Sequence, residues 1–250
     1  MAKTWKLSPG GVLTGITGIS AASGTIAHPD LGAVRYSLEQ LPDDMEGQVA
    51  HTIGLMRSYA LEDAVSPAIQ ADLYAALGEK ASALPQQDVA ARVFDYVKRR
   101  IRFVQDERLA SPWLVEGTDV IEVLVRPIDL SMQTAPRVGD CDDFSTYAAS
   151  LLTAAAVDNS FVTVAADASA PGQFSHVYVA AYPDGVRLPL DTSHGDYAGW
   201  ETMNYSRRKE WPVLGNWMGE GQSGNPVVLL VLGIVAFAHF IRNRKGVVRW

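Results

Sequence analysis

Between residues 46 and 102, apolar side chains recur every three or four positions, a spacing that predicts amphipathic helices. Three such stretches follow one another: the second ends before Gly78, and the third ends in the basic run 98–100. A basic run at the end of a helix complements the helix dipole and is usually solvated. We therefore expect three helices here, and we interpret the basic run as a helix end rather than a binding patch.

The pattern changes after residue 101. Residues 101–139 carry three prolines and predict loops with short strands. From Cys141 to residue 155, apolar residues again recur with helical spacing, which predicts a buried helix that begins at Cys141. Strand patterns follow at residues 161–165, 176–182 and 186–191, with the turn sequence Pro-Asp-Gly between the last two.

The hairpin formed by the last two strands brings two titratable residues together. If the turn consists of residues 184–185, Asp191 lies diagonal to His176 on one face of the sheet. A turn shifted back by one residue would place Asp191 directly opposite His176, whereas a three-residue loop would need a bulge to restore the shared face. Two of the three registers therefore predict a carboxylate beside an imidazole.

Cys141 is the only cysteine in the 250 residues, and its position at the predicted start of a helix makes it a candidate nucleophile. The helix dipole lowers the pKa of such a thiol, while the acidic residues on both sides of it oppose this. With His176 as proton acceptor and Asp191 orienting the imidazole, the three roles of thiol catalysis are filled. Taken singly, each residue has a simpler explanation: Cys141 could be a small buried hydrophobic residue, His176 a polar residue at the end of a strand and Asp191 a turn former. The backbone N–H of Cys141 and the side chain of Gln133 are candidate oxyanion donors.

Three segments resemble the transglutaminase-like cysteine peptidase superfamily: GDCDDFSTYAASLL at 139–152, SHVYVAAY at 175–182 and LPLDTS at 188–193. The chain is most similar to short proteins of this kind from bacteriophages and bacteria, over about residues 91–200. The resemblance implies an α+β, papain-like fold in which the helix bearing the cysteine packs on an antiparallel sheet. It also implies that Cys141, His176 and Asp191 are the catalytic residues.

Charge and composition exclude several other functions. The net charge of −7 leaves no broad basic surface for phosphate contacts, so we expect no nucleic-acid partner. A single cysteine excludes an intrachain disulfide. Cys141, His176, Asp191 and His194 lack the ligand spacings typical of metal sites, and we expect neither a metal nor another cofactor.

The two ends of the chain differ from its middle. Glycine, serine and threonine dilute the apolar residues before residue 44, so residues 1–44 are interpreted as an extended or flexible arm and not as a signal peptide. Residues 226–241 form an uncharged apolar run followed by a basic tail to residue 250, which predicts a transmembrane helix. The run is short for a span, so a buried or partner-bound helix is the alternative. Residues 213–225 predict a glycine-rich flexible tether.

In this division, residues 45–105 form a helical region and residues 106–212 form the catalytic core. We expect a membrane-tethered cysteine hydrolase or acyltransferase that acts on amide bonds of a protein or a cell-wall peptide. Its place would be at a membrane or in a virion, and otherwise in the cytoplasm. The alternative is a structural protein of a virion or membrane complex that keeps the fold without the activity.

Overall fold

The computed structural model describes residues 2–7, 23–28, 32–40, 42, 44–106, 108, 123–133 and 137–214. The chain divides into two units, Met1–Leu214 and Gly215–Trp250, and all described residues belong to the first. The described helices are α1 (Met45–Ala64), α2 (Pro67–Leu77), α3 (Gln86–Arg100), α5 (Pro127–Met132) and α6 (Cys141–Ala154), with 3-10 turns at Ala81–Ala83 and Pro183–Gly185. The described strands are β1 (Ala2–Leu7), β2 (Ser23–His28), β3 (Gly32–Gln40), β4 (Ile101–Phe103), β5 (Val123–Val125), β6 (Arg137–Gly139), β7 (Asn159–Val164), β8 (His176–Ala181), β9 (Leu188–Leu190) and β10 (Arg208–Pro212).

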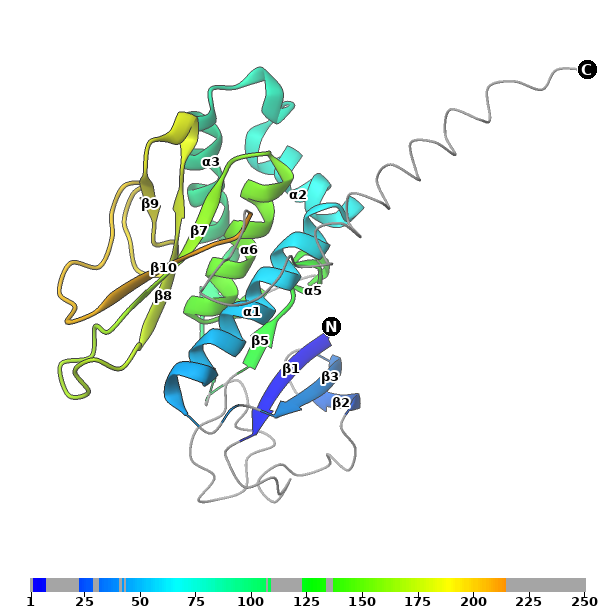
Figure 1. Cartoon of the computed structure of the whole chain (residues 1–250). Helices are drawn as coiled ribbons and strands as arrows, with labels where there is room; N and C mark the ends of the chain where they lie inside the picture. Colours follow the sequence, from blue (N-terminus) through cyan, green and yellow to red (C-terminus); the bar gives the residue numbers. More distant parts are fainter. Residues whose placement is uncertain are drawn as a thin grey trace, which may run out of the picture. The chain divides into compact units, whose positions relative to one another are not determined.

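Helix α6 lies at the centre of an α+β core, as the sequence predicts. Four strands form an antiparallel sheet in the order β10-β7-β8-β9. Helix α6 packs against β7 and β8 and also contacts α1, α2 and α3 (Figure 1). Because side chains alternate along a strand, Phe161 and Val179 join the main core, while Val162 and Tyr178 form a small cluster on the other face.

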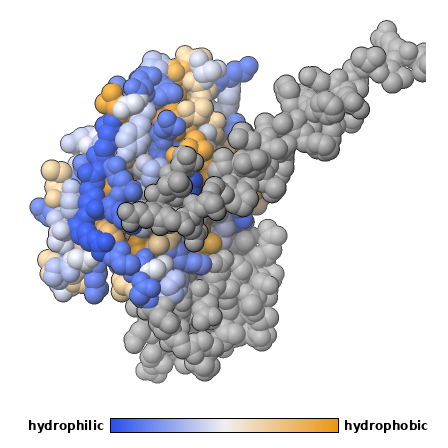
Figure 2. Space-filling model, in the orientation of Figure 1, coloured by the Kyte–Doolittle hydropathy of each residue, from blue (hydrophilic) through white to orange (hydrophobic). Residues whose placement is uncertain are grey.

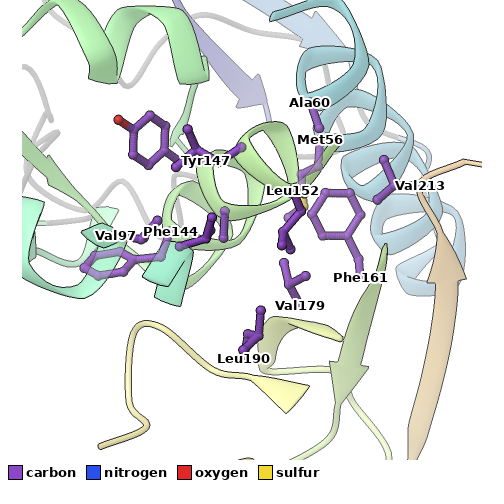
Figure 3. Packing of buried hydrophobic residues seen from close by; sticks show 14 of the residues in the cluster. Met56, Ala60, Val97, Phe144, Tyr147, Leu152, Phe161, Val179, Leu190 and Val213 are labelled. Carbon is purple, nitrogen blue, oxygen red and sulfur yellow. The ribbon is translucent and has the colours of Figure 1, made fainter. Parts of the chain in front are cut away.

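Figure 3 shows how the main core connects the helices to the sheet. Met56 of α1 and Leu152 of α6 meet Phe161 of β7, and none of the three side chains is exposed. Burying each of them stabilises the fold by roughly 1.5–3 kcal/mol. Val213 belongs to this core as well, because it is buried and its N–H donates to the Asn159 carbonyl at 2.9 Å. The predicted tether, 213–225, therefore does not begin at residue 213, and residues 215–225 lie outside the described part.

The three helices predicted between residues 46 and 102 are present as α1, α2 and α3. Their ends carry local capping signals. Asp44 caps α1 by accepting a hydrogen bond from the Gly47 N–H. Ser66 caps α2 directly before Pro67, which occupies the first turn. Gly78 then ends α2 with a φ of 74°, a left-handed conformation that glycine adopts without strain.

The hairpin adopts the first of the three registers considered above, because Val179 pairs with Leu190. Asp184 and Gly185 have φ values of 51° and 79°. Positive φ at both central positions is typical of a type I′ turn, for which Asp-Gly is a favoured sequence. Strand β9 is shorter than the predicted 186–191, and Asp191 directly follows its last residue.

Residues 1–44, predicted as an extended or flexible arm, include the three strands β1, β2 and β3. These strands and β5 form a second sheet in the order β2-β3-β1-β5, in which β1 runs parallel to β3. Lys3 pairs with Val125, from a distant part of the chain. The pairing of β1 with β5 joins distant residues and leaves no local pattern in the sequence, whereas the pairing of β2 with β3 is local and was missed.

Among the described residues between 101 and 139, where loops and short strands are predicted, lies the helix α5, which the pattern does not predict. Its first residue is Pro127, at a position where the missing N–H would have had no partner within the helix. The prolines of this region were interpreted as breaks in regular structure. Pro127 instead begins a short helix.

The described part of the surface in Figure 2 is largely hydrophilic, with scattered apolar patches. None of the described helices combines the length and the apolar composition that a bilayer crossing requires. The membrane helix predicted at residues 226–241 lies outside the described residues.

Candidate active site

Cys141 is the first residue of α6, as the sequence predicts. Asp140 is the N-cap of this helix, and its side chain accepts a hydrogen bond from the Asp142 N–H at 3.2 Å. In return, the Asp143 carboxylate accepts the Asp140 N–H at 3.3 Å. This reciprocal capping determines where the helix begins and places the thiol in its first turn. The positive end of the helix dipole favours a thiolate at that position.

Gly139 and Asp143 hold the start of α6 in place. Asp143 is fully buried, and its second oxygen accepts the Val125 N–H at 2.5 Å, which connects α6 to β5. A Cβ at position 139 would overlap the Asp143 side chain, so only glycine fits there. The run Gly-Asp-Cys-Asp-Asp is therefore explained in large part by capping and by close packing.

His176 and Asp191 are hydrogen-bonded to each other, with 2.7 Å between Nε2 and Oδ2. The Asp191 carboxylate is completely buried. It accepts further hydrogen bonds from the Thr202 hydroxyl at 3.2 Å, the Ser193 hydroxyl at 3.0 Å and the His194 N–H at 3.1 Å. Burial by itself raises the pKa of Asp191, but the hydrogen bonds, above all that of His176, bring this pKa below its usual value. Asp191 is thus an ionised acceptor that orients the imidazole.

A second histidine packs against the first. The rings of His194 and His176 meet edge to face, with their centroids 4.6 Å apart, and the His194 ring also contacts Phe103 of β4 at 5.4 Å. Burial, and next to it the proximity of the His176 imidazole, lower the pKa of His194, which therefore stays neutral at pH 7. From the sequence, His194 is expected only as a conceivable metal ligand. Its backbone N–H donates to Asp191, the partner of His176, which holds the two histidines near each other, and Phe103 packs against its ring from a distant part of the chain.

Cys141 and His176 line the same pocket, which has a volume of about 450 Å³. Its walls come from three regions: one side of α1, the start of α6, and the part of the sheet where β8 begins. The structure thus brings the predicted thiol and the predicted imidazole–carboxylate pair to one place. The described lining residues are Met45, Gln48, Val49, Thr52, Ile53, Met56, Asp140, Cys141, Asp142, Thr163, Phe174, Ser175, His176 and Val177.

The two candidate oxyanion donors differ in position. Gln133 directly follows α5 and is not among the described residues that line the pocket. The hydrogen-bond ladder of α6 begins with the Phe144 N–H, which donates to the Asp140 carbonyl at 3.0 Å. Cys141 precedes this first donor as the first residue of α6, and it lines the pocket.

Two groups of side chains have ligand atoms within 4.8 Å of one another, namely His176, Asp191 and His194, and Asp106, Asp140 and Asp143. The hydrogen bonds described above account for the first group. In the second, Asp140 and Asp143 accept N–H groups at the start of α6, and Asp106 accepts the Val123 N–H. We assign no metal to either group.

No protein-family model and no curated protein matches this chain. Among solved structures, it is similar to a "putative protease" from Parabacteroides distasonis, with 11% identity and a TM-score of 0.38. The similarity covers 67% of this chain and 35% of the other, so this chain spans about a third of that protein's length. A likeness this distant does not assign a chemistry, and the proposed function rests on the geometry of the site.

Proposed function

We propose that this chain is a transglutaminase-like cysteine hydrolase or acyltransferase that acts on an amide bond through Cys141, His176 and Asp191. The observation that carries the proposal is the hydrogen bond between His176 and the buried Asp191, at a pocket that also contains the thiol. A buried, ionised carboxylate that orients an imidazole is what a thiol nucleophile needs beside it.

The hydrogen bond also indicates which ring nitrogen would act. Because Asp191 is ionised, it accepts a hydrogen bond from Nε2–H of His176, and Nδ1 of the neutral ring is left as the proton acceptor. In the proposed reaction, Nδ1 takes the proton of Cys141 and the sulfur attacks the carbonyl carbon of the amide. The Cys141 N–H stabilises the resulting oxyanion.

The tetrahedral adduct then collapses. The C–N bond breaks, His176 returns its proton to the leaving amine, and a thioester on Cys141 remains. Water or a second amine, deprotonated by His176, attacks the thioester and releases the thiol. We propose a protein or a cell-wall peptide as the acyl donor, and a tether to a membrane through residues 226–241.

Alkylation by iodoacetamide tests the thiol directly and requires no knowledge of the substrate. At pH 7, Cys141 should react faster than free glutathione, and His176→Ala should remove this excess. A fall of at least about tenfold in the alkylation rate would correspond to a rise of one unit in the pKa of the Cys141 thiol. His51→Ala, a histidine substitution on α1 outside the pocket, is the matched control and should keep the wild-type rate.

Equal rates for the wild type, His176→Ala and glutathione would contradict the enzyme and favour a structural protein that keeps the fold. The tether requires a separate measurement. Carbonate extraction of membranes from expressing cells should leave the full chain in the pellet and release a chain that ends at residue 224. Release of both would overturn the membrane proposal and leave the enzyme untouched.

A further inference from the structure

The pocket extends well beyond the thiol and the imidazole. The residues that helix α1 contributes are alternately three positions and one position apart in the sequence. One side of the helix therefore faces the pocket over about three turns. These residues are Met45, Gln48, Val49, Thr52, Ile53 and Met56. None of them has a role in the proposed thiol chemistry.

The exposure of these residues falls along α1, which gives the pocket a direction. Met45, at the start of the helix, is 50% exposed, whereas Ile53 is 5% exposed and Met56 is fully buried. Val49 lies between them in sequence and is half-buried. The pocket therefore has an open end at the start of α1 and a closed, apolar end about two to three turns further along the helix.

The charges in the pocket restrict its occupant further. Among the described lining residues, the formal charges are the carboxylates of Asp140 and Asp142, and there is no lysine or arginine. An acidic side chain entering the pocket would lose its hydration and meet like charges, and among the described lining residues it would find no base other than His176. An apolar side chain would instead be buried against the methionine, valine and isoleucine of α1.

We propose that this part of the pocket binds a large apolar side chain of the acyl donor, such as leucine, methionine or phenylalanine, next to the bond that Cys141 attacks. This inference rests on the proposed function. A volume of about 450 Å³ is within the range of roughly 300–1,000 Å³ typical of ligand pockets and leaves room for a large side chain. Val49, half-buried midway along the pocket, determines the size that can enter.

Peptidyl chloromethyl ketones test this preference, because they alkylate the cysteine with loss of chloride and their side chains can be varied. Leucyl, phenylalanyl, alanyl and glutamyl reagents would be compared, with the varied residue first or second before the reactive carbon. Intact-mass measurements would report modification of Cys141. Either in the series that varies the first residue before the reactive carbon or in the series that varies the second, leucyl and phenylalanyl reagents should react about 10- to 200-fold faster than the glutamyl reagent.

The variant Val49→Trp should fill the middle of the pocket. When each rate is divided by the iodoacetamide rate of the same variant, the leucyl rate should fall to the alanyl rate or below it. Val65→Trp introduces the same side chain at an exposed position just after α1, and this control should keep the preference for leucyl.

Two negative results are distinguishable from each other. If Cys141 reacts rapidly with iodoacetamide but the glutamyl reagent matches the leucyl reagent, or if Val49→Trp keeps the preference, the apolar subsite is overturned and the thiol chemistry stands. If iodoacetamide itself shows no excess rate over glutathione, the proposed function fails, and the subsite fails with it.

Discussion

A single buried carboxylate organises the candidate site at the scale of residues. Asp191 accepts hydrogen bonds from His176, Thr202, Ser193 and the His194 backbone, so both of its oxygens are occupied. Burial alone would favour the protonated acid, but these donors favour the carboxylate, and the pKa of Asp191 lies below its usual value. His176 is therefore held by a partner that stays charged throughout the neutral pH range.

The substitution Asp191→Asn tests this role with little change in volume. The neutral amide cannot stabilise an imidazolium, so the alkylation rate of Cys141 at pH 7 should fall by at least about tenfold. Thr202→Val is the matched control, because it removes one hydrogen bond to the same oxygen and leaves the charge. Circular dichroism should show both variants folded. A folded Asp191→Asn variant with the wild-type rate would show that the charge has no effect on the thiol.

At the scale of elements, the position of the thiol depends on how α6 begins. Asp140 and Asp143 cap the helix, and Asp143 also connects it to β5. Gly139 has no side chain to displace Asp143. The place of Cys141 in the first turn is thus a consequence of the residues around it.

The substitution Gly139→Ala should disturb this arrangement. The added methyl group overlaps Asp143, and overpacking of this kind costs about 1–3 kcal/mol in the free energy of unfolding. The alkylation rate of Cys141 should fall as well, because the cap that positions it is displaced.

Gly54→Ala in α1 is the matched control, because a Cβ at that position has no neighbour within 4 Å. In the interior of a helix, this change should stabilise by roughly 0.5–1 kcal/mol. Urea denaturation would measure both variants. Stabilisation by Gly139→Ala would contradict the role assigned to Gly139.

At the scale of the whole molecule, a buried polar network joins α2, α3, α6 and β6. Asp72 accepts hydrogen bonds from the hydroxyl groups of Tyr96 and Tyr147 and from Arg137, whose Nη1 lies 3.1 Å away. Burial raises the pKa of Asp72, but its hydrogen bonds outweigh this and bring the pKa below its usual value. Because Arg137 begins β6, which leads to the cap of α6, the network connects the helical half of the chain to the site.

The substitution Asp72→Asn should destabilise the fold by about 3 kcal/mol at pH 7, because it leaves Arg137 buried without its counter-charge. Since the pKa of Asp72 is lower in the folded state, its contribution is full above the unfolded pKa of about 3.9 and is lost as the pH falls through the folded value. Urea denaturation at pH 7 and at about pH 3 should therefore show a difference that shrinks in acid. Asp95→Asn, an exposed partner of Arg99, should have little effect at either pH. A difference that grows in acid would contradict this account.

The sequence by itself determined the features that depend on neighbouring residues. Helix ends at Asp44, Ser66 and Gly78, the start of α6 at Cys141 and the Asp-Gly turn all follow from caps, spacing and turn chemistry. The hairpin pattern left three registers open and placed His176 beside Asp191 in two of them, one of which the structure adopts.

Only the tertiary structure decided which distant segments meet. The pairing of β1 with β5, the contact of His194 with Phe103 and the wall that α1 adds to the pocket join residues far apart in the chain. Periodicity shows which side of a helix or strand is buried, but it does not show which other segment of the chain covers that side. The candidate nucleophile and its candidate partners could therefore be predicted from local patterns, whereas the space around them had to come from the folded chain.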